Sequence, residues 1–76
     1  MLTPVQIKMA RVAVGLGVRE LAEAAEVAPS TISRFESEKG GLQARTLDRI
    51  QKVLERRGIL FIAADSSGGP GVRLKK

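Results

Sequence analysis

The spacing of apolar residues divides the chain into four helical segments and a shorter, strand-like C-terminal part. Through the first three quarters of the chain, apolar side chains recur every three or four positions, which places them on one face of an α-helix. The predicted inner faces are Ile7, Ala10 and Val14; Leu21, Ala22 and Ala25; Ile32 and Phe35; and Leu47, Ile50 and Leu54. This pattern predicts a small helical domain with one shared core.

The predicted helix ends carry residue types that helix termini prefer. Thr3 and Gln6 have the spacing of a capping box, and Pro4 between them suits the first helical position. Pro29 would remove a hydrogen bond from a helix interior, so we expect it to begin the third helix rather than continue the second. Gly58 is suited to the position just after the fourth helix.

After Gly58 the pattern becomes that of a β-hairpin. The segment ILFIAA, which begins at Ile59, favours a strand, and GVRLK, which begins at Gly71, alternates apolar with basic residues. The segment DSSGGP between them has the composition of a turn. The chain is therefore predicted to be mainly α, with a four-helix domain over residues 1–58 and a C-terminal hairpin over residues 59–76.

The first predicted strand is apolar on both faces, with Ile59 and Phe61 on one face and Leu60 and Ile62 on the other. A two-stranded hairpin is marginally stable in water, so one face is expected to lie on the helices while the other needs a cover. A second copy of the chain is the simplest cover, which predicts a homodimer. The predicted interface residues are Leu60, Phe61, Ile62, Val72 and Leu74.

Composition excludes several classes of function. The 76 residues include no Cys and no His, which excludes disulfide frameworks, thiolate metal sites and His-based catalysis. We expect no metal and no cofactor, and no recognisable catalytic constellation points to an enzyme. No apolar run approaches the roughly 20 residues of a membrane span, and no signal-peptide pattern opens the chain. These features predict a cytoplasmic protein.

The charge of the chain is basic and unevenly distributed. Thirteen Lys and Arg against eight Asp and Glu give a formal net charge of +5. Five of the acidic residues lie between Glu20 and Glu38, and most of the basic residues follow this stretch. Such an excess favours a polyanionic partner without identifying it. Only two residues are aromatic, both Phe at core spacing, which argues against a site for single-stranded nucleic acid.

The third predicted helix leaves polar residues on its outer face. On a wheel of about 100° per residue, Ser30, Ser33 and Arg34 lie opposite Ile32 and Phe35. One interpretation is a solvated helix face. The other is base reading in a major groove, where Arg binds the two acceptors of guanine and Ser serves several bases.

The segment GLGVRELAEAAEVAPSTISRFE, residues 15–36, resembles the helix-turn-helix of the XRE-like, phage-repressor (lambda repressor-like) family. The likeness extends from about Lys8 to Leu54, and STISRFE, which begins at Ser30, is among its most specific parts. It implies a lambda-repressor-like fold and binding to double-stranded DNA.

The resemblance also implies roles for individual residues. Ser30, Ser33 and Arg34 fall on the family's base-reading positions. Arg11 and Glu36 match a pair that forms an internal salt bridge in some members, so we interpret them as structural. The residues implied to contact the DNA backbone are Gly17, Val18, Arg19, Ser37, Lys39 and Arg45.

The sequence departs from the family pattern at four positions near the reading surface. Val18 stands where the family often has Gln, and Glu26 replaces the usual Gly of the turn. Ala28 replaces a Ser or Thr cap, and Pro29 occupies a position that often carries a reading side chain. The reading surface is therefore reduced, with Arg34 as its only charged member.

Two functions are compatible with these features. The first is a dimeric, sequence-specific DNA-binding regulator, a repressor of the phage or mobile-element type, acting on an inverted-repeat operator. The second is a protein-interaction module of antitoxin-like or antiactivator-like kind, which keeps the fold but binds a protein partner. The reduced reading surface motivates the second hypothesis, and the number of matched motif positions favours the first.

Overall fold

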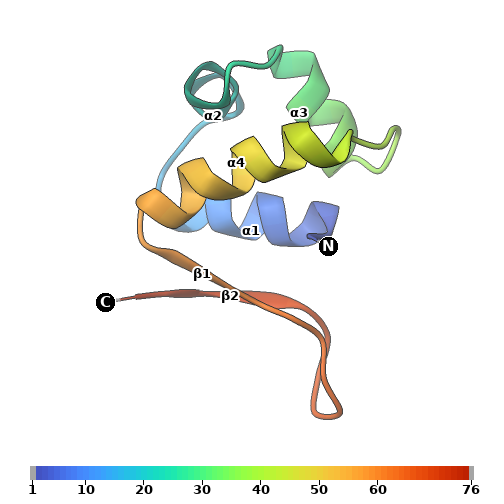
Figure 1. Cartoon of the computed structure of the whole chain (residues 1–76), viewed down its shortest axis with the longest axis vertical. Coiled ribbons are helices and arrows are strands. Elements are labelled where there is room, and N and C mark those ends of the chain that lie inside the picture. Colours follow the sequence, from blue (N-terminus) through green and yellow to red (C-terminus); the bar gives the residue numbers. More distant parts are fainter. Residues whose placement is uncertain (1, 76) are drawn as a thin grey trace.

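The computed structural model describes residues 2–75, which form four helices followed by a two-stranded antiparallel hairpin. The elements are α1 (Pro4–Ala13), α2 (Val18–Ala25), α3 (Pro29–Glu36), α4 (Ala44–Arg56), β1 (Ile59–Ile62) and β2 (Gly71–Leu74). Helices α1 and α4 form a middle layer, with α2 and α3 at one end of the molecule and the hairpin at the other (Figure 1). The predicted mainly α fold, with four helices and a C-terminal hairpin, is confirmed.

A single core joins the four helices to the first strand. It contains every residue of the predicted inner faces except Val14, which packs against it, and it adds Leu16, Val53 and Ile59. Leu54 and Ile59 are both fully buried on either side of Gly58, as expected of a helix end stabilised by an apolar contact. No helix within residues 2–75 has both the length and the apolar character needed to cross a bilayer.

Helix α1 begins with the capping box that its sequence predicts and ends at a left-handed glycine. The Thr3 hydroxyl accepts a hydrogen bond from the Gln6 N–H (3.2 Å), and the Gln6 side-chain oxygen accepts one from the Thr3 N–H (2.9 Å). At the other end, Gly15 is left-handed (φ +74°) and the Leu16 N–H donates to the Arg11 carbonyl (3.0 Å). Glycine is favoured there because a side chain would be strained at positive φ.

Two other helix ends use the same turn without glycine. Glu26 after α2 and Glu38 after α3 both have φ of +60°. The following amides close the turns, with the Val27 N–H donating to Ala22 (2.9 Å) and the Lys39 N–H to Arg34 (2.9 Å). For residues with a Cβ, this conformation costs on the order of 1 kcal/mol each. The turn on each side of α3 therefore carries backbone strain.

Glycine at these two positions should stabilise the protein. Glu26→Gly and Glu38→Gly are each expected to raise the free energy of unfolding by up to about 1 kcal/mol, because relief of the left-handed strain exceeds the added freedom of Gly in the unfolded chain. Glu23→Gly, on the exposed helical surface of α2, is the matched control and should lower it by a similar amount. Urea denaturation measures all three, and destabilisation by both turn variants would contradict the strain argument.

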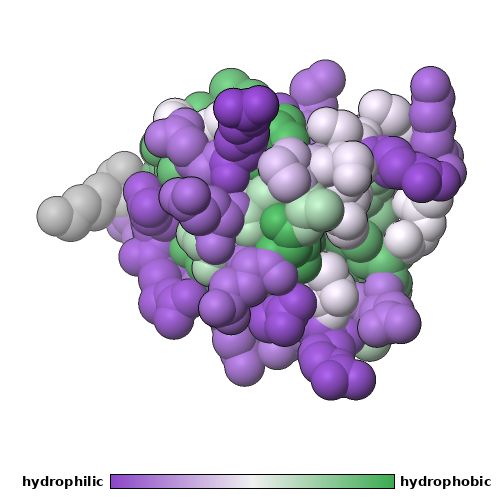
Figure 2. Space-filling model, turned by 90° about the horizontal axis from the view of Figure 1, so that it is seen from above, coloured by the Kyte–Doolittle hydropathy of each residue, from purple (hydrophilic) through white to green (hydrophobic). Residues whose placement is uncertain are grey.

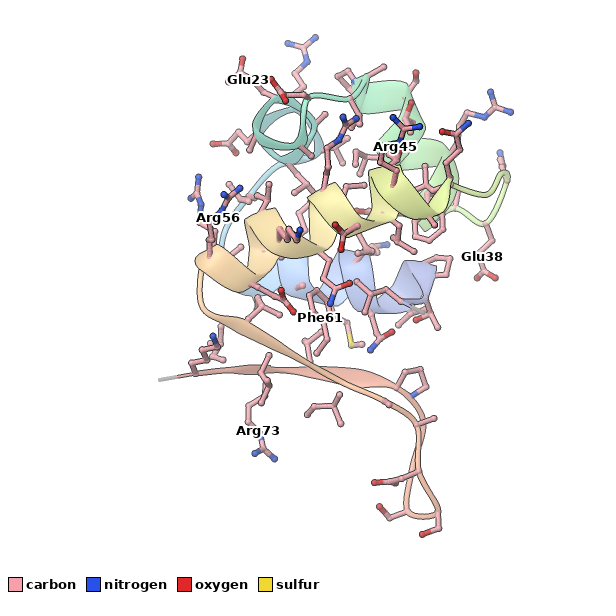
Figure 3. All side chains as sticks on the ribbon, in the orientation of Figure 1. Glu23, Glu38, Arg45, Arg56, Phe61 and Arg73 are labelled. Atoms are coloured by element: carbon pink, nitrogen blue, oxygen red, sulfur yellow. The ribbon has the colours of Figure 1, made fainter. Side chains whose placement is uncertain are left out.

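The hairpin register assigns its side chains to two faces. Ile59 pairs with Leu74 and Phe61 with Val72, and these four side chains share the face turned toward the helices. Phe61 and Val72 are partly buried against the core, whereas Leu74, at the end of the strand, is half exposed. In Figure 3, Phe61 points toward the helices and Arg73 points away from them.

The predicted dimer interface therefore combined side chains from both faces of the sheet. Phe61, Val72 and Leu74 belong to the inner face, and only Leu60 and Ile62 belong to the outer one. Alternation along a strand does not state which face meets the helices, so the sequence could not separate these two sets of side chains. The outer face is also not purely apolar, because Arg73 lies directly opposite Leu60.

The hairpin tip is an Asx-type turn. One Asp65 carboxylate oxygen accepts hydrogen bonds from the Ser67 hydroxyl (2.8 Å), the Ser67 N–H (2.9 Å) and the Gly68 N–H (3.1 Å). These bonds, above all the one from the Ser67 hydroxyl, lower the pKa of Asp65 below its usual 3.8. Their contribution is therefore complete above that value and is lost as the pH falls through the lowered pKa.

Gln6 fastens the hairpin to α1. Its side-chain nitrogen donates to the carbonyls of Ile62 and Gly71, both at 3.0 Å, while its side-chain oxygen remains in the capping box. The residue is 2% exposed, and both the oxygen and the nitrogen of its side-chain amide have hydrogen-bond partners. The sequence predicted only the capping role, because the two carbonyls lie 56 and 65 residues away.

Gln6→Glu tests this second role, because it keeps an acceptor for Thr3 while replacing the donor by a carboxylate oxygen. We expect the free energy of unfolding to fall by about 2–3 kcal/mol, since two hydrogen bonds are lost and a charge faces two carbonyl oxygens. Exposed Gln43→Glu is the matched control and should change it by less than about 0.5 kcal/mol. Equal effects of the two variants in urea denaturation would show that Gln6 does not fasten the hairpin.

Candidate nucleic-acid interface

Helices α2 and α3 meet across a short turn, and their small inner residues allow a close approach. Ala22 and Ala25 of α2 are fully or almost fully buried, as is Ile32 of α3. Pro29 is the first residue of α3, and Ala28 stands at its N-cap without a side-chain hydrogen bond. The missing cap, expected from the sequence, costs roughly 1 kcal/mol, and core packing must hold the helix instead.

The outer face of α3 carries the predicted base-reading residues together. Ser30, Ser33 and Arg34 are all exposed, and Ser37 continues the same face at the C-cap. Ile32 and Phe35 point the other way, into the core. Seen from the end that carries α2 and α3, the surface shows a pale, weakly polar area bordered by strongly hydrophilic residues (Figure 2).

Arg34 is free to contact a ligand. Among residues 2–75 the ion pairs are Arg11 with Glu36 and Lys52 with Asp48, so Arg34 has no acidic partner in this part of the chain. Its guanidinium lies beside the loop after α3, where a Cβ at Gly40 would be 4.0 Å from Nε and Nη2. An exposed guanidinium on a helix face can form two parallel hydrogen bonds to a base edge or a phosphate.

The N-terminus of α2 presents backbone amides as a second part of the site. The N–H groups of Val18 and Arg19 belong to the first helical turn and have no acceptor within the helix. Such groups favour an anion. Gly17 is different, because its N–H already donates to the Glu20 carboxylate (2.8 Å). Of the three predicted contacts here, Val18 and Arg19 have available amides and Gly17 does not.

The segment that leads from α3 into α4 carries the two other basic residues predicted to contact the DNA backbone. Lys39 lies in the loop between these helices and Arg45 in the first turn of α4, and both side chains are exposed. In Figure 3, Arg45 projects from α4 toward the end of the molecule that carries α2 and α3. Both positions are compatible with contact to a phosphate backbone that runs past α3.

The expected ion pair between Arg11 and Glu36 is present and joins α1 to α3. Arg11 Nε lies 2.8 Å from one Glu36 oxygen and Nη2 lies 2.9 Å from the other, while Nη1 donates to the Leu16 carbonyl (3.1 Å). Hydrogen bonding to Glu36 raises the pKa of Arg11 above the usual value of an arginine. The stabilisation it brings is thus complete below the unfolded-state pKa and is lost only at more alkaline pH.

Arg11 and Glu36 are therefore used within the fold, as the sequence suggested. Their side chains are only 14% and 8% exposed, and every charged group is occupied by a protein partner. Because Glu36 is the last residue of α3, the pair helps to set the orientation of that helix on α1. The ion pair supports the candidate interface without forming part of its exposed surface.

Comparison with known proteins agrees with this geometry. A family model described as Helix-turn-helix matches residues 7–59, which is 53 of the 76 residues. The match runs from α1 to the start of β1 and includes all of α2 and α3. A search among curated proteins finds no significant match.

Proposed function

The chain belongs to the helix-turn-helix family and is a DNA-binding regulator of that family, and we propose that it acts as a homodimeric repressor on an inverted-repeat operator. In this proposal α3 lies in the major groove and reads base edges through Ser30, Ser33 and Arg34. Val18, Arg19, Ser37, Lys39 and Arg45 contact the phosphate backbone, and the hairpin region holds the two copies together.

The observation that carries this proposal is the exposed polar face of α3 with an unpaired arginine at its centre. A folded protein gains little by holding Ser30, Ser33 and Arg34 on one rigid, exposed surface, whereas a major groove accepts a helix presenting such groups. The free amides at the α2 N-terminus and the basic residues Lys39 and Arg45 after α3 lie on neighbouring elements. There they can fix the position of α3 along the duplex.

The small number of reading residues is the reason for proposing a dimer. One bidentate arginine contact gives roughly 1–3 kcal/mol of discrimination, while specific sites generally require about 4–10 kcal/mol over non-specific DNA. One copy with a single arginine and two serines falls short of this requirement. Two copies that read half-sites about one helical turn apart double the available discrimination.

Selection from a pool of random duplex DNA tests the proposal. At about 150 mM salt the Debye length is about 8 Å and weak, non-specific phosphate binding is reduced. We expect the bound fraction to contain an inverted repeat, and a reporter gene placed downstream of it should be expressed less when the protein is present. Enrichment of no sequence would overturn the proposed specificity, and increased reporter expression would overturn the proposed sign.

A protein-interaction module is the second candidate function. The observations that favour it are the uncapped Ala28 and the exposed Pro29, which offer a DNA groove neither a charge nor a donor at the start of α3. In this case a partner protein would bind equally well to the wild type and to Arg34→Ala, and neither protein would bind duplex DNA above the non-specific level.

A further inference from the structure

Helix α1 has an apolar surface that the fold leaves uncovered. Val5 and Val12 are 54% and 62% exposed and are two of the four exposed large apolar residues among residues 2–75. They lie on the same face of the helix as Met9, at the spacing i, i+4 and i+7. An open groove runs along this face, lined by Val5, Lys8, Met9, Val12, Ala13 and Glu36.

Strand β2 has a hydrogen-bonding edge that the fold also leaves uncovered. Within the described residues 2–75 the sheet has two strands, so each strand has one open edge. The Lys75 N–H donates to the Gly58 carbonyl (2.9 Å), which makes these two residues a hydrogen-bonded pair. By the alternation of antiparallel pairs, the backbone groups of Val72 and Leu74 then point away from β1. Such an edge is a template for another strand.

The uncovered face of α1 and the open edge of β2 lie on the same side of the molecule. Of the two strands, β2 is the one that packs against α1, and β1 is the one that packs against α4. Around α1, Gln6 points to the hairpin, Arg11 points to α3, and Ile7 and Ala10 point into the core. The remaining face, that of Val5, Met9 and Val12, is turned away from α4 and hence toward the side on which β2 is open.

From this arrangement we propose that a second copy of the chain covers both features at once, by pairing its β2 with β2 and laying its α1 against α1. The two hairpins form one four-stranded sheet, and a two-fold axis runs perpendicular to that sheet between the two β2 strands. The helices α1 are then antiparallel, so that Val5 of one copy lies near Val12 of the other and Met9 lies near the axis. This inference rests on the proposed homodimer and specifies its interface.

The positive charge of Arg73 favours one pairing register between the two β2 strands. If Arg73 of one copy lay opposite Arg73 of the other, two like charges would face each other directly, which is destabilising. Pairing Val72 with Val72 of the second copy instead places each Arg73 opposite a Gly71, which has no side chain. The backbone groups at the axis are then the outward-pointing ones of Val72.

The position of α3 favours this dimer over stacking of the two outer sheet faces. The outer face of the hairpin and α3 lie at opposite ends of the longest axis of the molecule, which measures 34 Å (Figure 1). Stacking outer face on outer face would place the two α3 helices at the far ends of the dimer, facing in opposite directions. Edge pairing turns both α3 helices to the same side, where one duplex can contact both.

Edge pairing through β1 is disfavoured by the charge of α4. That edge lies on the side of α4, and pairing there would bring two α4 helices together. After Ala44, the exposed residues of α4 are all charged: Arg45, Asp48, Arg49, Lys52 and Arg56. Burying such residues against their own copies would be costly, whereas α1 offers an apolar face with a charged rim.

A glutamate placed on α1 distinguishes these arrangements. Val12→Glu should weaken the dimer at least about 30-fold, because it places a carboxylate in the apolar part of the interface, and Val5→Glu should act similarly. Leu60→Glu is the matched control: it is also an exposed apolar residue, but on the outer sheet face, and should leave the dimer constant within about 3-fold. Sedimentation equilibrium over a concentration series, without DNA, measures the constant, and circular dichroism checks that each variant is folded.

A crosslink provides a second measurement that does not depend on weakening the dimer. The chain has no Cys, so Met9→Cys introduces a single thiol close to the proposed axis. Oxidation should give mostly disulfide-linked dimer at low protein concentration, since the two thiols lie within reach of each other. Leu60→Cys should remain largely monomeric on denaturing gels under the same conditions.

The outcomes separate this interface from the proposed function. Dissociation by Leu60→Glu with no effect of Val12→Glu would overturn the interface in favour of face stacking, and a wild-type mass that stays monomeric at all concentrations would overturn any dimer. A dimer that behaves as expected but selects no DNA would leave the interface intact and overturn the operator-binding proposal. Selection of an inverted repeat that the protein binds only as two independent copies would overturn the interface and leave sequence-specific DNA binding intact.

Discussion

Arg34→Ala is expected to reduce affinity for the selected inverted repeat by roughly 30-fold to 20,000-fold. Each half-site loses a bidentate contact of about 1–3 kcal/mol, and the two copies of a dimer lose it twice. Affinity for random-sequence DNA should fall far less, because only one positive charge per copy is removed. Fluorescence anisotropy with the selected site and with a scrambled duplex, at one fixed salt concentration, measures both effects.

Arg56→Ala is the matched control for this experiment. Arg56 is also exposed and is the last residue of α4, at the opposite end of that helix from Arg45 (Figure 3). The substitution changes the net charge by the same amount as Arg34→Ala. It should lower affinity for selected and scrambled DNA by a similar, small factor. Equal losses of specific affinity in the two variants would mean that Arg34 contributes charge alone.

Arg11→Ala is expected to lower the free energy of unfolding by about 3 kcal/mol. Glu36, which is 8% exposed in the intact pair, would lose its cationic partner, and removal of one partner from a buried pair typically costs about 3–5 kcal/mol. The Arg11 side chain is 14% exposed, so we expect a loss at the lower end of that range. In a domain of this size such a loss is a large part of the total stability.

The exposed pair of Lys52 and Asp48 is the control for the ion pair. Its side chains are 66% and 56% exposed, so Lys52→Ala should change the free energy of unfolding by less than about 0.5 kcal/mol. The double variant Arg11→Ala with Glu36→Ala should lower the free energy of unfolding by less than the sum of the two single variants, because no buried charge is left without a partner. Additive effects in urea denaturation would contradict a direct coupling between Arg11 and Glu36.

The candidate interface could be predicted from the sequence because its parts are close together along the chain. Ser30, Ser33 and Arg34 share one helix, and the wheel that places Ile32 and Phe35 inside necessarily places them outside. The hydrogen bond from the Gly17 N–H to Glu20 was not predicted. Glu20, three residues later, nevertheless has the spacing at which a carboxylate reaches back to the N-cap. That spacing was present in the sequence and could have shown that the amide is occupied.

The uncovered apolar face of α1 was not predicted from the sequence, because it depends on how distant segments pack. The apolar residues of α1 at positions 5, 9 and 12 follow a helical spacing as regular as that of the core. Periodicity shows that two faces of α1 are apolar but does not show which of them meets the other helices. The same ambiguity assigned the side chain of Phe61 to the predicted interface, although it packs against the core.

The sequence by itself determined the helices, their ends, the hairpin and the family, because capping, periodicity, turn composition and motif matches are properties of short segments. Only the tertiary structure decided which sheet face is covered, which face of α1 remains open, and that Gln6 binds carbonyls at the end of the hairpin ladder. These outcomes depend on contacts between residues far apart in the chain. Such contacts are set by the packing of the whole core, which no local pattern specifies.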